Sequence, residues 1–79
     1  MAKTKNPNLD YKIRLLAIER MLRKDQFINT TQIRASLDLN YDIQVERKTL
    51  YSDLMAIDKF IPLEVKSGNN GGYKIMTFE

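Results

Sequence analysis

The chain has 79 residues, enough for one small domain, and a chain of this size buries only about 60 % of its unfolded surface. Its 13 basic and 10 acidic residues leave a formal charge of +3, a mild excess that favours an anionic partner. Cysteine and histidine are absent, which excludes disulfides and argues against zinc and against histidine-based catalysis.

Motifs for catalysis and for membrane insertion are also missing. The sequence has no phosphate-binding loop, no nucleophile elbow, no dinucleotide fingerprint and no acidic cluster at metal-ligand spacing. Asp53 and Asp58 lack the cleft that a catalytic carboxylate pair needs, so we expect them to be solvated or capping charges. No apolar run approaches the ~20 residues of a membrane span, and no signal peptide is recognisable. We therefore expect a cytoplasmic protein that is not an enzyme and has no metal or cofactor.

The first expected helix follows a polar N-terminal segment. Residues 1–8 show no periodicity, which favours a flexible tail over the alternative of a groove-binding arm. Apolar residues then recur at helical spacing and predict a helix over about 9–24, with Asn8 as its N-cap. The predicted apolar face consists of Tyr11, Leu15, Ile18 and Leu22, widened by Ile13, Leu16, Ala17 and Met21.

A short connector leads into the second expected helix. Phe27 and Ile28 predict a buried connector, with a strand of a single bridge as one form of it. Asn29 followed three residues later by Gln32 fits a capping box, in which each side chain satisfies a backbone amide of the other residue. We therefore predict a helix over about 29–39.

The end of this helix and the segment after it hold large side chains. Asn40 is a plausible stop signal. Tyr41 and Ile43 are large for a loop, so we expect them to pack between the helices. The apolar stripe of the second helix is narrow and consists of Ile33, Leu37 and Leu39.

The third expected helix, over about 46–60, carries the most informative pattern in the chain. Pro62 keeps the residue before it out of the helical region and so ends the helix. Its buried stripe is predicted to be Leu50, Leu54, Ile57 and Ile61. Its opposite face carries Lys48, Ser52, Met55 and Lys59 and is flanked by Arg47, Thr49 and Tyr51. This mixture of cations, hydroxyl donors and soft apolar tips suits phosphates and base edges.

Alternating apolar and polar residues over about 62–78 predict a β-hairpin. Asn70 and Gly71 offer the positive φ values that a tight hairpin turn requires. The alternation places Tyr73, Ile75, Leu63 and Val65 toward the core. It places Lys74, Met76 and Phe78 on the other face.

Three helices followed by a hairpin predict a mainly α, α+β domain with the order of a three-helix winged helix-turn-helix over residues 9–79. The chain resembles the N-terminal DNA-binding domains of DeoR-like and WYL-type bacterial transcriptional regulators, and more distantly the biotin-repressor winged helix. The resemblance rests on four segments: RLLAI (14–18), TTQI (30–33), ERKTLYSDL (46–54) and PLEVKSGNNGGYKI (62–75).

This resemblance implies sequence-specific binding of double-stranded DNA, with the third helix in the major groove. The wing, Ser67 to Gly72 with Asn69 and Asn70, would lie on the adjacent backbone or minor groove, with Lys66 and Lys74 beside it. The DNA-facing residues of the helix would be Arg47, Lys48, Thr49, Tyr51 and Ser52.

Two positions depart from the family pattern. Ser52 replaces an arginine that many relatives have, which implies a weaker contact with DNA. Glu46 stands where many relatives have a capping serine or aspartate, and its charge suits the helix dipole but would repel a nearby phosphate.

The alternative is a winged helix that binds protein or forms oligomers, since fold alone does not specify function. A DNA-binding domain should gather its cations on one surface, whereas an adaptor should expose a contiguous apolar patch. Relatives usually continue into an effector domain after the wing. Met76 and Phe78 on the outer face of the last strand therefore predict either a homodimer contact or the junction to a missing C-terminal effector domain.

Overall fold

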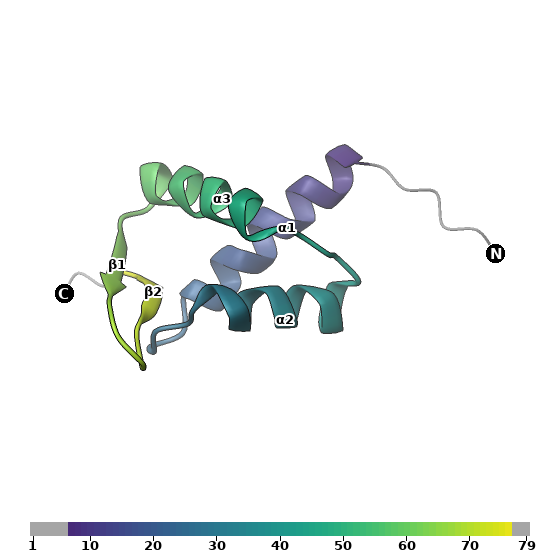
Figure 1. The fold of residues 1–79 in the computed structure, drawn as a ribbon. Helices are drawn as coiled ribbons and strands as arrows, with labels where there is room; N and C mark the ends of the chain where they lie inside the picture. The colour runs from purple at the N-terminus through teal and green to yellow at the C-terminus, as the bar shows by residue number, and fades with distance from the viewer. Residues whose placement is uncertain (1–6, 77–79) are drawn as a thin grey trace.

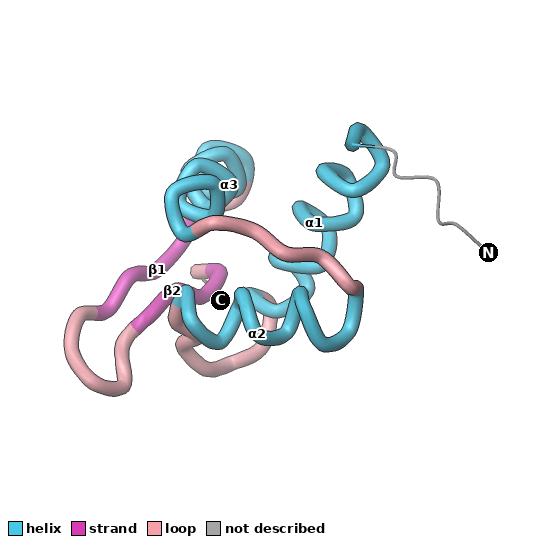
Figure 2. Tube along the Cα trace, turned by 45° about the vertical axis from the view of Figure 1, so that its right-hand side comes forward, coloured by secondary structure: helices cyan, strands magenta, loops and turns pink. Residues whose placement is uncertain are grey.

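The structure, a computed structural model, describes residues 7–76 of the chain. Three helices are followed by a two-stranded antiparallel hairpin, so the mainly α class with a winged-helix order is confirmed (Figure 1). The elements, which Figure 2 colours by type, are α1 (Pro7–Leu22), α2 (Thr30–Tyr41), α3 (Arg47–Phe60), β1 (Leu63–Lys66) and β2 (Gly72–Ile75). Helix α1 crosses behind α2 and α3, and the hairpin lies at the end of the molecule where α2 begins and α3 ends (Figure 1).

Helix α1 begins and ends two residues earlier than its sequence pattern predicts. Pro7 is its first residue, a position where the missing amide hydrogen is not needed and the fixed φ favours the helix. Asn8 therefore lies inside the first turn, and its prediction as the N-cap is wrong. Residues 7 and 8 therefore belong to the helix and not to the predicted tail 1–8, and residues 1–6 lie outside the described part of the chain.

The start of α2 matches the predicted capping box, but its end does not match. The Asn29 side chain accepts from the Gln32 amide at 2.8 Å, and the Asn29 amide donates to the Gln32 side chain at 2.9 Å. The helix continues past Asn40 to a C-cap at Asp42, which adopts a left-handed φ of 55°. The Asp42 amide donates to the Asp38 carbonyl at 3.2 Å. Aspartate tolerates this conformation better than most residues, so Asp42 ends the helix.

The core lies where the three helices meet. Leu16 and Leu39 were predicted to be part of the buried faces, but 66 % and 84 % of their surfaces are exposed. At 100° per residue, Leu39 is rotated by about 200° from the buried Leu37, so it points away from the core. Tyr11 and Tyr41 are 45 % and 37 % exposed and lie outside the core, contrary to prediction, whereas Ile43 is buried as predicted. The buried apolar residues are Ala17, Ile18, Met21, Leu22, Ile33, Leu37, Ile43, Leu50, Leu54 and Ile57.

The hairpin is tied to the connector between α1 and α2. Strand β1 pairs with β2 so that Leu63 faces Ile75 and Lys66 faces Gly72. Ile28 forms the predicted single bridge to Tyr73, with amide-to-carbonyl distances of 3.0 and 2.8 Å in the two directions. This bridge adds a third chain segment to the edge of the sheet and fixes the hairpin against the helices.

The loop of the hairpin differs from the predicted tight turn. The positive φ values in the loop and at its end fall on Gly68 and Gly72, not on Asn70 and Gly71. A turn is closed by the Gly71 amide, which donates to the Gly68 carbonyl at 3.1 Å. Glycine adopts positive φ without steric cost, so Gly68 and Gly72 adopt the positive φ values that were predicted for Asn70 and Gly71.

Candidate nucleic-acid interface

The outer face of α3 presents the side chains that the sequence assigns to DNA contact. Since Leu50, Leu54 and Ile57 face the core, the opposite side of the helix points to solvent. All five α3 residues of the predicted site are exposed: Arg47, Lys48, Thr49, Tyr51 and Ser52. The structure thus brings these side chains together over the first two turns of one helix.

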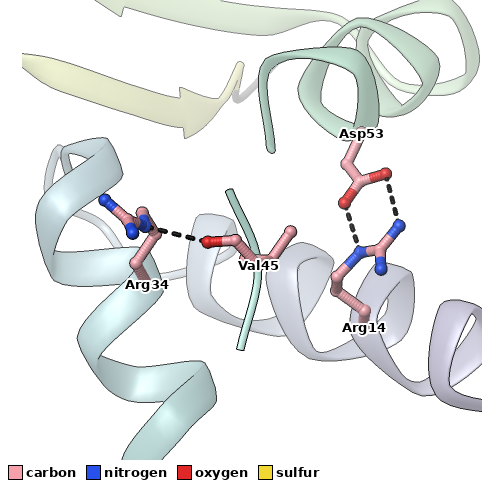
Figure 3. Close-up of polar contacts among 4 residues, drawn as sticks. All are labelled: Arg14, Arg34, Val45 and Asp53. Carbon is pink, nitrogen blue, oxygen red and sulfur yellow. Dashed lines mark hydrogen bonds and ion pairs between the residues drawn. The ribbon is translucent and has the colours of Figure 1, made fainter. Parts of the chain in front are cut away.

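Asp53, the only acidic residue among the first eleven residues of α3, does not face solvent. Only 3 % of its surface is exposed, and its carboxylate accepts from Arg14 Nε at 2.5 Å and from a terminal Arg14 nitrogen at 3.1 Å (Figure 3). The prediction that Asp53 is a solvated or capping charge is therefore wrong. Asp58 is exposed and accepts from the Leu63 amide at 2.9 Å, which fits a capping role at the junction of α3 and β1. Asp53 therefore adds no negative charge to the outer face, and the exposed carboxylate next to its first turn is that of Glu46 at the N-cap.

Glu46 and Arg34 define the start of α3. Glu46 occupies the N-cap position, but its side chain makes no capping hydrogen bond. Arg34 on α2 donates through Nε to the Val45 carbonyl at 3.0 Å (Figure 3). This bond joins α2 to the segment that enters α3, so it helps to fix the angle between the two helices. No sequence pattern predicted this role of Arg34, because the acceptor is a backbone carbonyl 11 residues away.

An open groove of about 400 Å³ separates α3 from the hairpin. Tyr51 and Tyr73 border it from the two sides, and burial together with the neighbouring Tyr51 raises the pKa of Tyr73. Val65 was predicted to face the core, but it is 66 % exposed because it borders this open groove instead. The groove is lined by Tyr51, Leu54, Met55, Asp58, Leu63, Val65 and Tyr73.

The two predicted wing lysines lie together around an aromatic ring. Lys66 Nζ lies 5.7 Å and Lys74 Nζ 5.1 Å from the centre of the Phe27 ring, within cation-π range. Lys74 also pairs with Asp25 at 3.3 Å, and only 19 % of its side chain is exposed. The strand register puts Lys66 and Lys74 on the hairpin face opposite Val65, which borders the groove with α3. The wing lysines and the α3 cations therefore form two groups, not the single positive surface that was expected of a DNA-binding domain.

The tip of the hairpin packs against the connector before α2. Asn69 and Asn70 are exposed and border a polar hollow of about 260 Å³ whose other walls include Gln26, Phe27 and Gln32. A Cβ atom at Gly72 would lie 2.3 Å from the Ile28 carbonyl oxygen. The base of the loop is thus held closely, while its two asparagines remain accessible.

A second open groove, of about 230 Å³, runs between α1 and α3. Its walls are almost entirely apolar, and Phe60 and Leu16 beside it are 87 % and 66 % exposed. Met76, predicted to be a contact residue, is half-buried and donates through its amide to the Pro62 carbonyl at 2.9 Å. Phe78 lies outside the described residues, so its predicted role stays a prediction.

Among residues 7–76, no group of three or more acidic side chains is placed to hold a metal ion. Within the same range, no helix is both long and apolar enough to cross a membrane. Neither a protein-family model, nor a curated protein, nor a solved structure matches the chain. Its function therefore has to be inferred from its own residues and their arrangement.

Proposed function

We propose that the protein binds double-stranded DNA in a sequence-specific manner, as a bacterial-type transcriptional regulator or as its N-terminal domain. The single observation that carries this proposal is the outer face of α3. That face exposes two cations and three hydroxyl groups in its first two turns, while the nearby carboxylate of Asp53 is buried and paired with Arg14. An α-helix fits the major groove, where such donors reach phosphates and base edges.

In the proposed complex, α3 enters the major groove with its N-terminal turns toward the bases, as the second helix of a helix-turn-helix does. The hairpin loop, Ser67 to Gly72, then lies along the adjacent backbone or minor groove. Lys66, which is exposed, supplies positive charge there, and Asn69 and Asn70 supply amide donors. Lys74 is mostly covered, pairs with Asp25 and lies over the Phe27 ring, so it stabilises the wing on the face that packs against the connector.

The salt dependence of binding to a duplex tests this proposal. If about four to six phosphates are neutralised, the logarithm of the association constant should fall with the logarithm of the salt concentration at a slope of roughly −4 to −5. A slope near zero, or no binding at low salt, would contradict it. Selection from a random duplex pool should recover a shared motif, and the absence of any motif would limit the protein to nonspecific binding.

A second candidate function is supported by the groove between α1 and α3. Phe60 and Leu16 give this side of the molecule the exposed apolar surface that a protein-binding or oligomerisation module requires. The groove uses Ala56 and Phe60 in the C-terminal turns of α3, whereas the proposed DNA contacts lie in its first two turns. Ser52 and Ala56 are one helical turn apart on the same side of α3, so a protein bound in the groove would lie next to the DNA.

A further inference from the structure

The outer face of α3 contains an apolar strip between its cations. Met55 is 72 % exposed, and Tyr51, one helical turn before it, is 44 % exposed. Lys48 and Lys59 are exposed on the same side of the helix. Met55 is not part of the core, so the strip is free to contact a partner outside the domain.

The strip lies beside an open groove, where an apolar group on a base edge of the major groove would find apolar side chains. Met55 and Tyr51 border the open groove between α3 and the hairpin, and Val65 borders it from the other side with 66 % of its surface exposed. In the major groove, base edges offer one apolar group, the C5-methyl group of thymine. The flanking cations would hold the phosphates on either side of such a base.

The composition of α3 points to the same base. Adenine is usually read by asparagine or glutamine, and α3 contains neither residue. Cytosine is read by a carboxylate, but Asp53 is paired with Arg14, and Asp58 accepts from the Leu63 amide. Besides hydroxyl groups, which do not select one base, cations for guanine and apolar groups for thymine are the base-reading chemistry that remains.

We propose that Met55 and the ring of Tyr51 read thymine C5-methyl groups in the major groove. This inference rests on the proposed DNA binding and adds the base class that α3 recognises. Burial of one methyl group against Met55 corresponds to about a fourfold gain in affinity, taking ~0.8 kcal/mol per buried carbon.

The test uses a duplex recovered by selection and resynthesised with deoxyuridine in place of thymidine. Deoxyuridine keeps the pairing edge and removes only the C5-methyl group. The wild-type protein should bind the thymidine duplex about fourfold more tightly for each methyl group that it contacts. Met55→Ala should bind the thymidine duplex less tightly and should lose most of this preference.

Matched variants separate the inference from the proposed function. Lys59→Ala should reduce the salt dependence and keep the thymidine preference, and Tyr51→Phe should also keep the preference because its ring is retained. If the wild type binds both duplexes equally well, methyl recognition is wrong while DNA binding stands. If Met55→Ala keeps the full preference, Met55 is not the reader. If the wild type binds neither duplex, nor the starting pool at low salt, the proposed function itself is wrong.

Discussion

Arg14 on α1 holds the carboxylate of Asp53 on α3 through two hydrogen bonds, and side-chain exposure is only 15 % for Arg14 and 3 % for Asp53. The Arg14 guanidinium also lies 5.1 Å from the centre of the Tyr11 ring, so its position is supported from α1 itself. This pair sits directly behind the first turns of α3. It therefore neutralises the buried carboxylate of Asp53 on the inner side of α3 and fixes the helix that carries the proposed contacts.

Replacement of Arg14 by methionine should destabilise the fold by about 3–5 kcal/mol, because Asp53 would remain buried without its partner. The double variant Arg14→Met with Asp53→Leu should recover much of this loss, since apolar side chains of similar size replace a buried ion pair well. Urea unfolding of the three proteins measures both effects.

The control for the Arg14 experiment is Arg23, which pairs with Glu19 on the surface of α1 and has 58 % of its side chain exposed. Arg23→Met should cost less than about 1 kcal/mol, because exposed ion pairs contribute little. If Arg14→Met proved as mild as Arg23→Met, the pair would not be the constraint on α3 that its burial indicates.

Lys48 and Lys74 should respond differently to replacement by alanine. Lys48 is exposed on the outer face of α3, so Lys48→Ala should lower the steepness of the salt dependence of DNA binding by about one and leave the unfolding midpoint unchanged. Lys74 contacts Phe27 and Asp25, so Lys74→Ala should lower the midpoint and change the salt slope less. Equal effects of the two variants on the salt slope would place Lys74 among the phosphate contacts. An unchanged slope for Lys48→Ala would remove Lys48 from them.

The two glycines with positive φ in the hairpin offer a matched pair of substitutions. Gly68 has a φ of 104° and no atom within 4 Å of an added Cβ, so Gly68→Ala should cost only the backbone strain, about 1–3 kcal/mol. Gly72 has a φ of 146°, and its added Cβ would also meet the Ile28 backbone. Gly72→Ala should therefore cost clearly more, because the bridge between Ile28 and Tyr73 must open. Equal unfolding midpoints for the two variants would show that the connector at Ile28 shifts to accommodate the added Cβ at little cost in stability.

Local signals in the sequence predicted the parts of the fold that depend on neighbouring residues. The capping box of Asn29 and Gln32 and the bridge at Ile28 both follow from short-range patterns, and both are confirmed. The prediction of positive φ at Asn70 and Gly71 is wrong, because the loop turns through positive φ at Gly68 and Gly72 instead.

The burial of Asp53 was missed although a signal for it existed. Asp53 lies three residues after Leu50 and four before Ile57, so helical periodicity already places it on the buried face. Arg14 is four residues before the buried Ile18, and opposite charges within two buried faces point to an ion pair. The cluster of Phe27 with Lys66 and Lys74 had no such signal, because it depends on how the hairpin docks on the connector.

Core and surface positions of α3 should separate stability from binding. Leu54 is 3 % exposed, so Leu54→Ala should cost roughly 2–5 kcal/mol and unfold much of so small a domain. Met55, the next residue, is 72 % exposed, and Met55→Ala should leave the unfolding midpoint nearly unchanged. Thermal unfolding followed by circular dichroism distinguishes the two outcomes. A large loss of stability in Met55→Ala would mean that this side chain packs against the wing.

Self-association should depend on Phe60 if the groove between α1 and α3 is a contact between two copies of the chain. Phe60 is 87 % exposed beside an apolar groove, and burial of such surface in a second copy would stabilise a dimer. Sedimentation over a concentration series should then show a rising mass for the wild type and a monomer for Phe60→Ser.

Phe78→Ser, tested in parallel, separates this groove from the contact predicted at the last strand. If only Phe78→Ser abolished association, the contact would lie at the C-terminal strand. A wild type that stays monomeric at high concentration would argue against both surfaces as dimer contacts. Because Phe60 is the last residue of α3 and the proposed contacts Arg47 to Ser52 lie in its first two turns, Phe60→Ser should in either case keep its affinity for a half-site duplex.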